Sequence, residues 1–117
     1  MNQALRDADY LEHIQDAIAR IGRYTADKVE ADFLGNELIQ DGVIRNLEII
    51  GEAVTKLSPE LKARYAGVPW GENPGCETIH GYISVNLEIV WSTVQKVVPD
   101  FLGKITDIQR ELGLPPQ

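Results

Sequence analysis

The sequence predicts an all-α fold, an antiparallel bundle of four main helices with short extra helices. Apolar residues recur at steps of three and four along most of the chain, as they do on the buried face of a helix. No stretch alternates apolar and polar residues between turn-forming residues, so we expect no strands. The 117 residues are 44% hydrophobic and 25% charged, which fits a single domain over residues 1–117 with one core.

The first two main helices carry the strongest pattern. Residues 9–22 form an amphipathic helix, and residues 27–34 form either a short helix or an extension of the next one. The clearest helix covers residues 36–57, with an apolar stripe at Ile39, Val43, Leu47, Ile50, Val54 and Leu57. Gly42 and Gly51 inside it each cost up to about 1 kcal/mol relative to Ala, which indicates close approach of another helix.

The second half of the chain alternates helices with one long irregular segment. Ser58 and Pro59 suit the N-cap and first position of a short helix that ends before Gly67. Residues 68–81 are rich in Pro and Gly and predict a loop with at most one helical turn, near Glu77 to His80. Two further helical stripes cover residues 87–98 and 99–113, and Pro99 is expected to interrupt them.

Charge and cysteine usage exclude several classes of function. Eleven Lys and Arg against eighteen Asp and Glu give a net charge of -7, which disfavours DNA packing and other non-specific binding to polyanions. No apolar run is long enough to span a membrane and the start has no signal-peptide pattern, so we expect a cytoplasmic protein. The single cysteine, Cys76, cannot form an internal disulfide, and we expect no metal and no cofactor.

A row of charged residues follows one side of the helix predicted at 36–57. Asp41, Arg45, Glu48 and Glu52 are spaced by 4, 3 and 4 residues, so Arg45 can pair with Asp41 or Glu48. A solvated ladder of ion pairs is the simpler interpretation. The alternative is that Arg45, Glu48 and Glu52 line a site or face a partner.

The residues best suited to chemistry are His80 and Tyr82, at the end of the predicted loop. A histidine can take up and return a proton near neutral pH, as cleavage of RNA by its own 2′-hydroxyl requires. That reaction also needs a cation near the phosphorus, and no Lys or Arg occurs between Arg64 and Lys96. From the residues alone, a structural or helix-capping His80 is at least as well supported as a catalytic one.

Two long stretches of the sequence carry a family resemblance. VIRNLEIIGEAVTKLSPELKARYAGVPW, followed by IHGYISVNLEIVWSTVQKVVPDFLGKI, resembles the HepT-like branch of the HEPN superfamily, the toxin half of HepT/MntA toxin-antitoxin pairs. The most specific parts are residues 45–53, Pro69-Trp70, the His80-Gly81-Tyr82 motif, and Trp91 with Pro99 behind it.

The resemblance implies a homodimer with the two His80 loops near its interface, acting as a metal-independent endoribonuclease on RNA. It implies an MntA-like nucleotidyltransferase antitoxin as partner, which uses ATP to place AMP on a tyrosine. His80 would be the general acid/base and Tyr82 the acceptor of AMP, whose bulk and charge would block the phosphate site.

The sequence departs from the family motif in one place. The family has an arginine separated from the histidine by four to six residues, at positions where this chain has Asn73, Pro74 and Gly75. Three explanations are open: a degenerate member that keeps the fold and partner, a deliberately inactivated variant, or an arginine supplied from elsewhere, such as Arg45 or Arg64. The alternative function is a non-catalytic helical partner or substrate-presenting subunit of a minimal nucleotidyltransferase.

Overall fold

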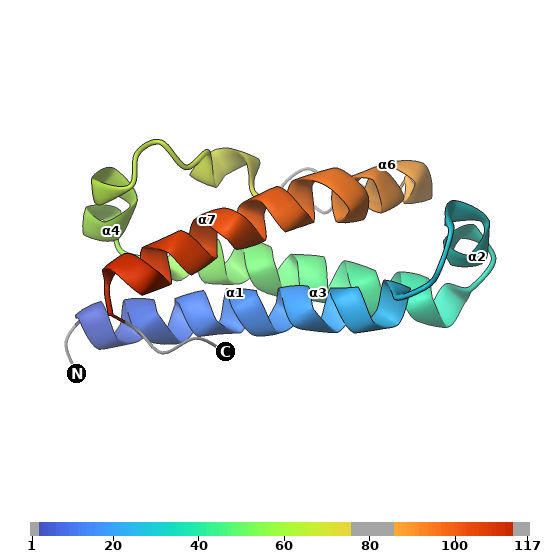
Figure 1. Cartoon of the computed structure of the whole chain (residues 1–117), viewed down its shortest axis with the longest axis horizontal. Helices are drawn as coiled ribbons and strands as arrows, with labels where there is room; N and C mark the ends of the chain where they lie inside the picture. The colour runs from blue at the N-terminus through green and yellow to red at the C-terminus, as the bar shows by residue number, and fades with distance from the viewer. Residues whose placement is uncertain (1–2, 76–85, 114–117) are drawn as a thin grey trace.

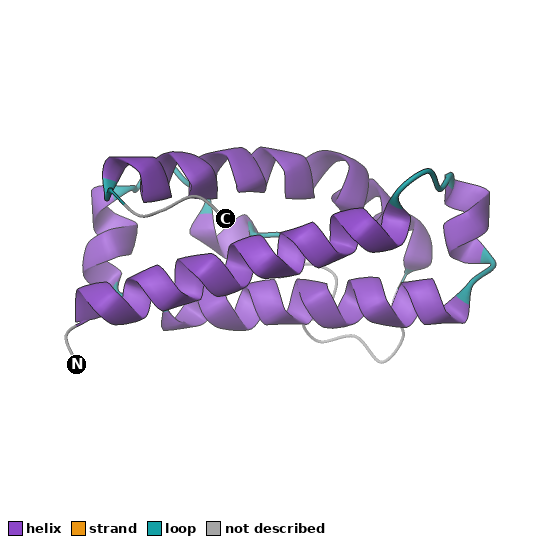
Figure 2. Ribbon diagram, turned by 60° about the horizontal axis from the view of Figure 1, so that its bottom comes forward, coloured by secondary structure: helices purple, strands orange, loops and turns teal. Residues whose placement is uncertain are grey.

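The computed structural model describes residues 3–75 and 86–113, and every regular element in these two ranges is a helix (Figures 1 and 2). The long elements are α1 (Gln3–Thr25), α3 (Glu37–Lys56) and α7 (Val98–Glu111). The short ones are α2 (Glu30–Leu34), α4 (Pro59–Arg64), a 3-10 turn η1 (Trp70–Glu72), α6 (Leu87–Ser92) and a π-helical turn η2 (Thr93–Val97). The predicted all-α bundle is confirmed. None of the helices in the described ranges is both long and apolar enough to cross a membrane.

The long helices are not all antiparallel to one another. Figure 1 shows α1 running one way along the bundle, while α3 and the rod formed by α6, η2 and α7 run the other way. This is because the chain lies at one end of the bundle in α4 and at the other end where α6 begins. Residues 65–75, which follow α4, lead back from that end along the bundle (Figure 1).

The core lies between α1, α3 and the rod. Leu11, Ile14 and Ile21 of α1 and Val43, Leu47 and Ile50 of α3 have at most 1% of their surface exposed. The rod closes the same core with a third row, Val90, Val94, Val98, Phe101, Ile105 and Ile108. Burying a side chain of this size contributes about 1.5–3 kcal/mol, so the predicted apolar stripes hold the three helical elements together.

α1 is longer than the predicted helix over residues 9–22. It continues past Gly22 because the ring of Tyr24 packs against α3, where a Cβ on Gly42 would lie 3.1 Å from the ring carbons. The Thr25 hydroxyl also donates to the carbonyl of Ile21 at 2.8 Å and closes the last turn. Asp27, with φ 59°, then turns the chain into α2, so residues 30–34 form a separate short helix.

The ends of α3 and α4 follow the capping residues that the sequence contains. The Asn36 side chain accepts from the Ile39 nitrogen at 3.1 Å, and the Ser58 hydroxyl accepts from the Leu61 nitrogen at 3.1 Å. Ser58 is also fastened to α1, because the buried Asp7 carboxylate accepts from its nitrogen at 2.9 Å and from its hydroxyl at 2.6 Å. The predicted helix over 36–57 and the Ser58 N-cap are thus confirmed to within one residue.

Pro99 does not break the last two predicted helices apart. α6 leads into α7 through η2, and Pro99 occupies the first turn of α7. A proline inside a helix lacks an N–H and its ring displaces a carbonyl one turn earlier. The π-helical turn directly before Pro99 widens the backbone at this position, so the rod continues with a local bulge.

Candidate functional site

The segment that leads to the His80 motif is held by the side chain of Trp70. Its Nε1 donates to the carbonyl of Tyr65 at 3.2 Å, and its ring meets that of Phe101 edge to face at a centroid distance of 6.2 Å. Buried Trp side chains usually combine a large apolar contact with one hydrogen bond of this kind. Trp70 therefore joins η1 to α7 and fixes the start of the segment.

Asn73, Pro74 and Gly75 form the last described turn before residues 76–85, and all three are buried. The Asn73 Nδ2 donates to the carbonyl of Trp70 at 2.9 Å, and its Oδ1 accepts from the Gly75 nitrogen at 2.9 Å. An Asn side chain that bonds to the backbone two residues later mimics a turn and stabilises it. We call residues 69–75 the loop base.

The loop base ends on α3, where two backbones touch. A Cβ on Gly75 would overlap the carbonyl oxygen of Leu47 and lie 2.7 Å from the nitrogen of Gly51. Because these are backbone atoms within a helix, they cannot move aside, and only glycine fits at position 75. The close approach predicted at Gly51 is thus real, but the approaching segment is the loop base and not a helix.

The other end of residues 76–85 is fixed by a helix cap. The Asn86 Oδ1 accepts from the nitrogens of Glu88 at 3.0 Å and Ile89 at 3.1 Å, which starts α6. Asn86 was not among the candidate residues, although its position one residue before an apolar helical stripe is a signal for an N-cap. Both ends of the segment that carries the motif are therefore anchored on the bundle.

The structure gives different outcomes for the predicted site residues. His80 and Tyr82 lie outside the described residues, so their predicted roles stay predictions. Glu48 is half-buried on α3 close to the contact with Gly75, while Arg45 and Glu52 are exposed.

The predicted ladder of ion pairs along α3 is not formed. Within residues 3–75 and 86–113, the ion pairs are Lys104–Asp100 at 2.8 Å and Arg110–Asp107 at 3.0 Å, both on α7. Arg45 makes no such pair with Asp41 or Glu48. Arg64, the other arginine considered for the site, lies over the Tyr65 ring at 5.4 Å and lines a hollow beside α4 with Asp7 and Ser58.

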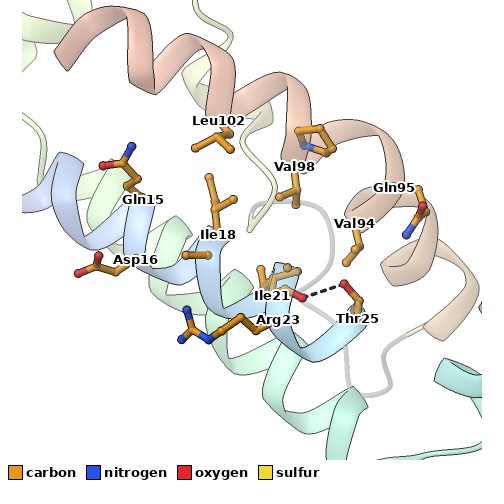
Figure 3. Close-up of a pocket in the computed structure, with 13 residues that line it drawn as sticks. Gln15, Asp16, Ile18, Ile21, Arg23, Thr25, Val94, Gln95, Val98 and Leu102 are labelled. Carbon is orange, nitrogen blue, oxygen red and sulfur yellow. Dashed lines mark hydrogen bonds between the residues drawn. The ribbon is translucent and has the colours of Figure 1, made fainter. Parts of the chain in front are cut away.

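Two grooves on the described surface differ in chemistry. The larger, of about 760 Å³, lies between α1 and the rod and is lined mainly by apolar side chains such as Ile18, Val94, Val98 and Leu102 (Figure 3). Its charged lining residues are Asp16 and Arg23. No histidine is among them, so the described lining lacks a group that exchanges protons near neutral pH.

The smaller groove, of about 470 Å³, lies between the loop base and the rod. Glu72, Asn73 and Pro74 line one side, and Thr93, Lys96 and Asp100 line the other. We call it the loop-base groove. Lys96, for which the sequence predicted no role, therefore lies beside the segment that precedes His80 in the chain.

The described residues contain no group of three or more His, Cys, Asp and Glu that could hold a metal ion. This statement covers neither Cys76 nor His80, because both lie in the range 76–85.

Comparison with known proteins gives matches over most of the chain. The model of the family described as ribonuclease HepT-like matches residues 14–108. A Thermococcus cleftensis protein named "Probable ribonuclease HepT" is 36% identical over 104 residues, which cover 87% of this chain and 94% of that protein. A protein of Caldanaerobacter subterraneus subsp. tengcongensis named "Putative RNase" is 37% identical over 102 residues, covering 85% of this chain and 90% of that protein.

A longer relative contains the same region as part of a larger protein. The Methanocaldococcus jannaschii protein named "Gamma-glutamylcyclotransferase and putative RNase" is 40% identical over 105 residues, covering 88% of this chain. The match covers 47% of that relative, so this chain spans about half its length. No solved structure matches the chain significantly.

Proposed function

Since the chain belongs to the ribonuclease HepT-like family of HEPN proteins, we propose that it cleaves RNA as the toxin of a toxin-antitoxin pair. The observation that supports this most is the family match over residues 14–108, which spans the loop base, the His80 motif and the rod. The anchoring of both ends of residues 76–85, by Gly75 on α3 and by Asn86 on α6, agrees with a motif that must be held in place.

His80 is the general acid/base of the proposed reaction. It accepts the proton of an RNA 2′-hydroxyl, whose oxygen attacks the adjacent phosphorus. The bond from phosphorus to the 5′-oxygen breaks, and that oxygen leaves with a proton returned by the imidazole. The products are a 2′,3′-cyclic phosphate and a 5′-hydroxyl, so the reaction consumes no water and needs no redox partner.

Tyr82 is the proposed point of control. An MntA-like nucleotidyltransferase antitoxin transfers AMP from ATP to the Tyr82 hydroxyl and releases pyrophosphate. The adduct adds bulk and a negative phosphate two residues from His80, which opposes binding of another phosphate group. In the proposed homodimer, the two loops lie near the interface, so modification of one protomer would affect a shared site.

A non-catalytic subunit is the second candidate, and one observation favours it. The positions of the family arginine hold Asn73, Pro74 and Gly75, which are buried and used to shape the loop base. None of the three can supply a cation to a phosphate. In this alternative the chain still binds the nucleotidyltransferase and presents Tyr82, but does not cut RNA.

Incubation of the purified protein with a mixed RNA pool distinguishes the two functions. The ribonuclease should give fragments that end in a cyclic phosphate, and the variant His80→Ala should give none. Addition of the nucleotidyltransferase and ATP should stop cleavage by the original protein and leave a Tyr82→Phe variant active. If the original protein forms the complex and accepts AMP but never cuts, the second candidate is correct.

A further inference from the structure

We propose that Lys96 supplies the positive charge that the loop lacks, by binding an RNA phosphate in the loop-base groove. This inference rests on the proposed function and names the residue that contacts the substrate's phosphate. Lys96 lies in η2 and lines the groove opposite Asn73 and Pro74, two of the positions where the family has its arginine. The Lys96 side chain approaches this region from the rod, whereas the family arginine approaches it from the loop.

All eleven Lys and Arg of the chain lie in the described residues, so the candidates can be compared directly. Arg20 donates to Asn46 at 2.7 Å, and Lys104 and Arg110 pair with Asp100 and Asp107. Lys96 is the cation that lines a described groove together with residues of the loop base.

The two arginines considered from the sequence are less well placed. Arg64 lies beside α4 over the Tyr65 ring, in a hollow that contains no residue of the loop base. Arg45 is exposed on α3 and lines none of the described grooves. Lys96 therefore remains the strongest candidate.

The charges around Lys96 leave its ammonium group available. Asp100 lines the same groove, but its carboxylate is paired with Lys104 at 2.8 Å. Glu72 also lines the groove and is exposed, and among the described residues neither it nor Asp100 forms an ion pair with Lys96. The net charge of -7 opposes phosphate binding over the molecule as a whole, so the attraction proposed here is local to the unpaired Lys96 ammonium, beside the carboxylates of Glu72 and Asp100.

The test compares cleavage of the RNA pool by the original protein, Lys96→Ala and Lys96→Arg. Lys28→Ala is the matched control, because Lys28 is also exposed, lies before α2 and lines none of the described grooves. Loss of a charge that stabilises the reacting phosphate typically lowers the rate about 100-fold. We expect that loss for Lys96→Ala, a rate within about tenfold of the original for Lys96→Arg, and no change for Lys28→Ala.

A second measurement tests the contact without cleavage. Binding of a fully 2′-O-methylated RNA, which has no nucleophilic hydroxyl, is followed by fluorescence anisotropy from low to moderate salt. Removal of one phosphate contact lowers the slope of log affinity against log salt by about 0.7 for single-stranded RNA. We expect this change for Lys96→Ala and not for Lys28→Ala, whereas a merely structural lysine would leave the slope unchanged.

The outcomes separate this inference from the proposed function. If the original protein cuts, His80→Ala does not, and Lys96→Ala matches the original in rate and slope, the Lys96 contact is refuted and the ribonuclease stands. If the original protein does not cut but Lys96→Ala lowers the salt slope, the Lys96 contact is supported and cleavage is refuted. If the original protein neither cuts nor binds the methylated RNA, both are refuted.

Discussion

The interface between α1 and α3 and the loop base keep their shapes by different means. The interface is built from rows of apolar side chains, such as Ile14, Ile21, Leu47 and Ile50, with the Arg20–Asn46 hydrogen bond among them. The loop base is built from the Asn73 turn, the Trp70 anchor and a backbone contact at Gly75. The stability of the interface therefore depends on how much apolar surface it buries. The shape of the loop base depends on whether a Cβ fits at position 75.

The largest loss of stability is expected from a change in the interface between α1 and α3. Ile50→Ala removes a side chain with 0% exposure from the centre of α3, and such changes cost about 2–5 kcal/mol in free energy of unfolding. Urea unfolding followed by circular dichroism should show a large fall in midpoint. The matched control is Ile89→Ala on α6, where 49% of the side chain is exposed and the loss should stay below about 1 kcal/mol. Equal losses would mean that burial does not set the stability of this interface.

The next largest effect on stability is expected at the loop base, where the two glycines of one contact should respond differently to alanine. Gly75→Ala places a Cβ against backbone atoms of Leu47 and Gly51, and overpacking of this kind costs about 1–3 kcal/mol. Gly51→Ala adds a Cβ on the other side of the same contact, 3.6 Å from the Gly75 Cα, which is an ordinary distance. Alanine is also the better helix former, so Gly51→Ala should leave stability unchanged or raise it by up to about 1 kcal/mol. Thermal unfolding of the two variants side by side checks this, and a loss in both would show that α3 itself cannot accept a methyl group there.

A smaller effect is expected at the polar contact inside the interface. Asn46→Ala leaves the half-buried Arg20 Nε without its partner and removes the side-chain bond to the Gly42 carbonyl, at a cost of about 1–2 kcal/mol. The double variant with Arg20→Ala should lose less than the sum of the two single changes. Additive losses in this double-mutant cycle would show that the 2.7 Å hydrogen bond contributes nothing to stability.

The smallest effect belongs to the outer side of α3, which has neither buried apolar surface nor close backbone contacts. Arg45 is exposed and forms no ion pair within the described residues, so Arg45→Ala should change the free energy of unfolding by less than about 0.5 kcal/mol. Urea unfolding measures this directly. A loss of stability above about 1 kcal/mol would mean that Arg45 forms ion pairs in solution, as the predicted ladder requires.

The helices whose apolar residues recur at regular steps could be predicted from the sequence. The apolar stripe over residues 36–57 and the Ser58-Pro59 start of the next helix predicted the bounds of α3 to within one residue. α1 was predicted too short because glycine lowers helix propensity locally, whereas the packing of Tyr24 on Gly42 is a tertiary contact that periodicity does not contain. The same holds for Pro99, whose effect is absorbed by a π-helical turn.

The candidate site was only partly predictable. Gly51 signalled a close approach, but the residue that must be glycine is Gly75, because its Cβ would overlap backbone atoms whereas a Cβ on Gly51 would lie 3.6 Å from the nearest one. Lys96 is ten residues from Asn86 and twenty-two from Pro74 along the chain, and no local pattern relates it to the loop base. The roles of His80 and Tyr82 stay predictions, since both residues lie outside the described ranges.

The most direct test of the account is whether this chain cuts RNA through His80. The purified protein and its His80→Ala variant are incubated with the same mixed RNA pool, and fragments with cyclic phosphate ends are counted over time. The account predicts fragments from the original protein and none from His80→Ala, with both variants equally folded. An inert original protein, or equal cleavage by the two, would contradict it.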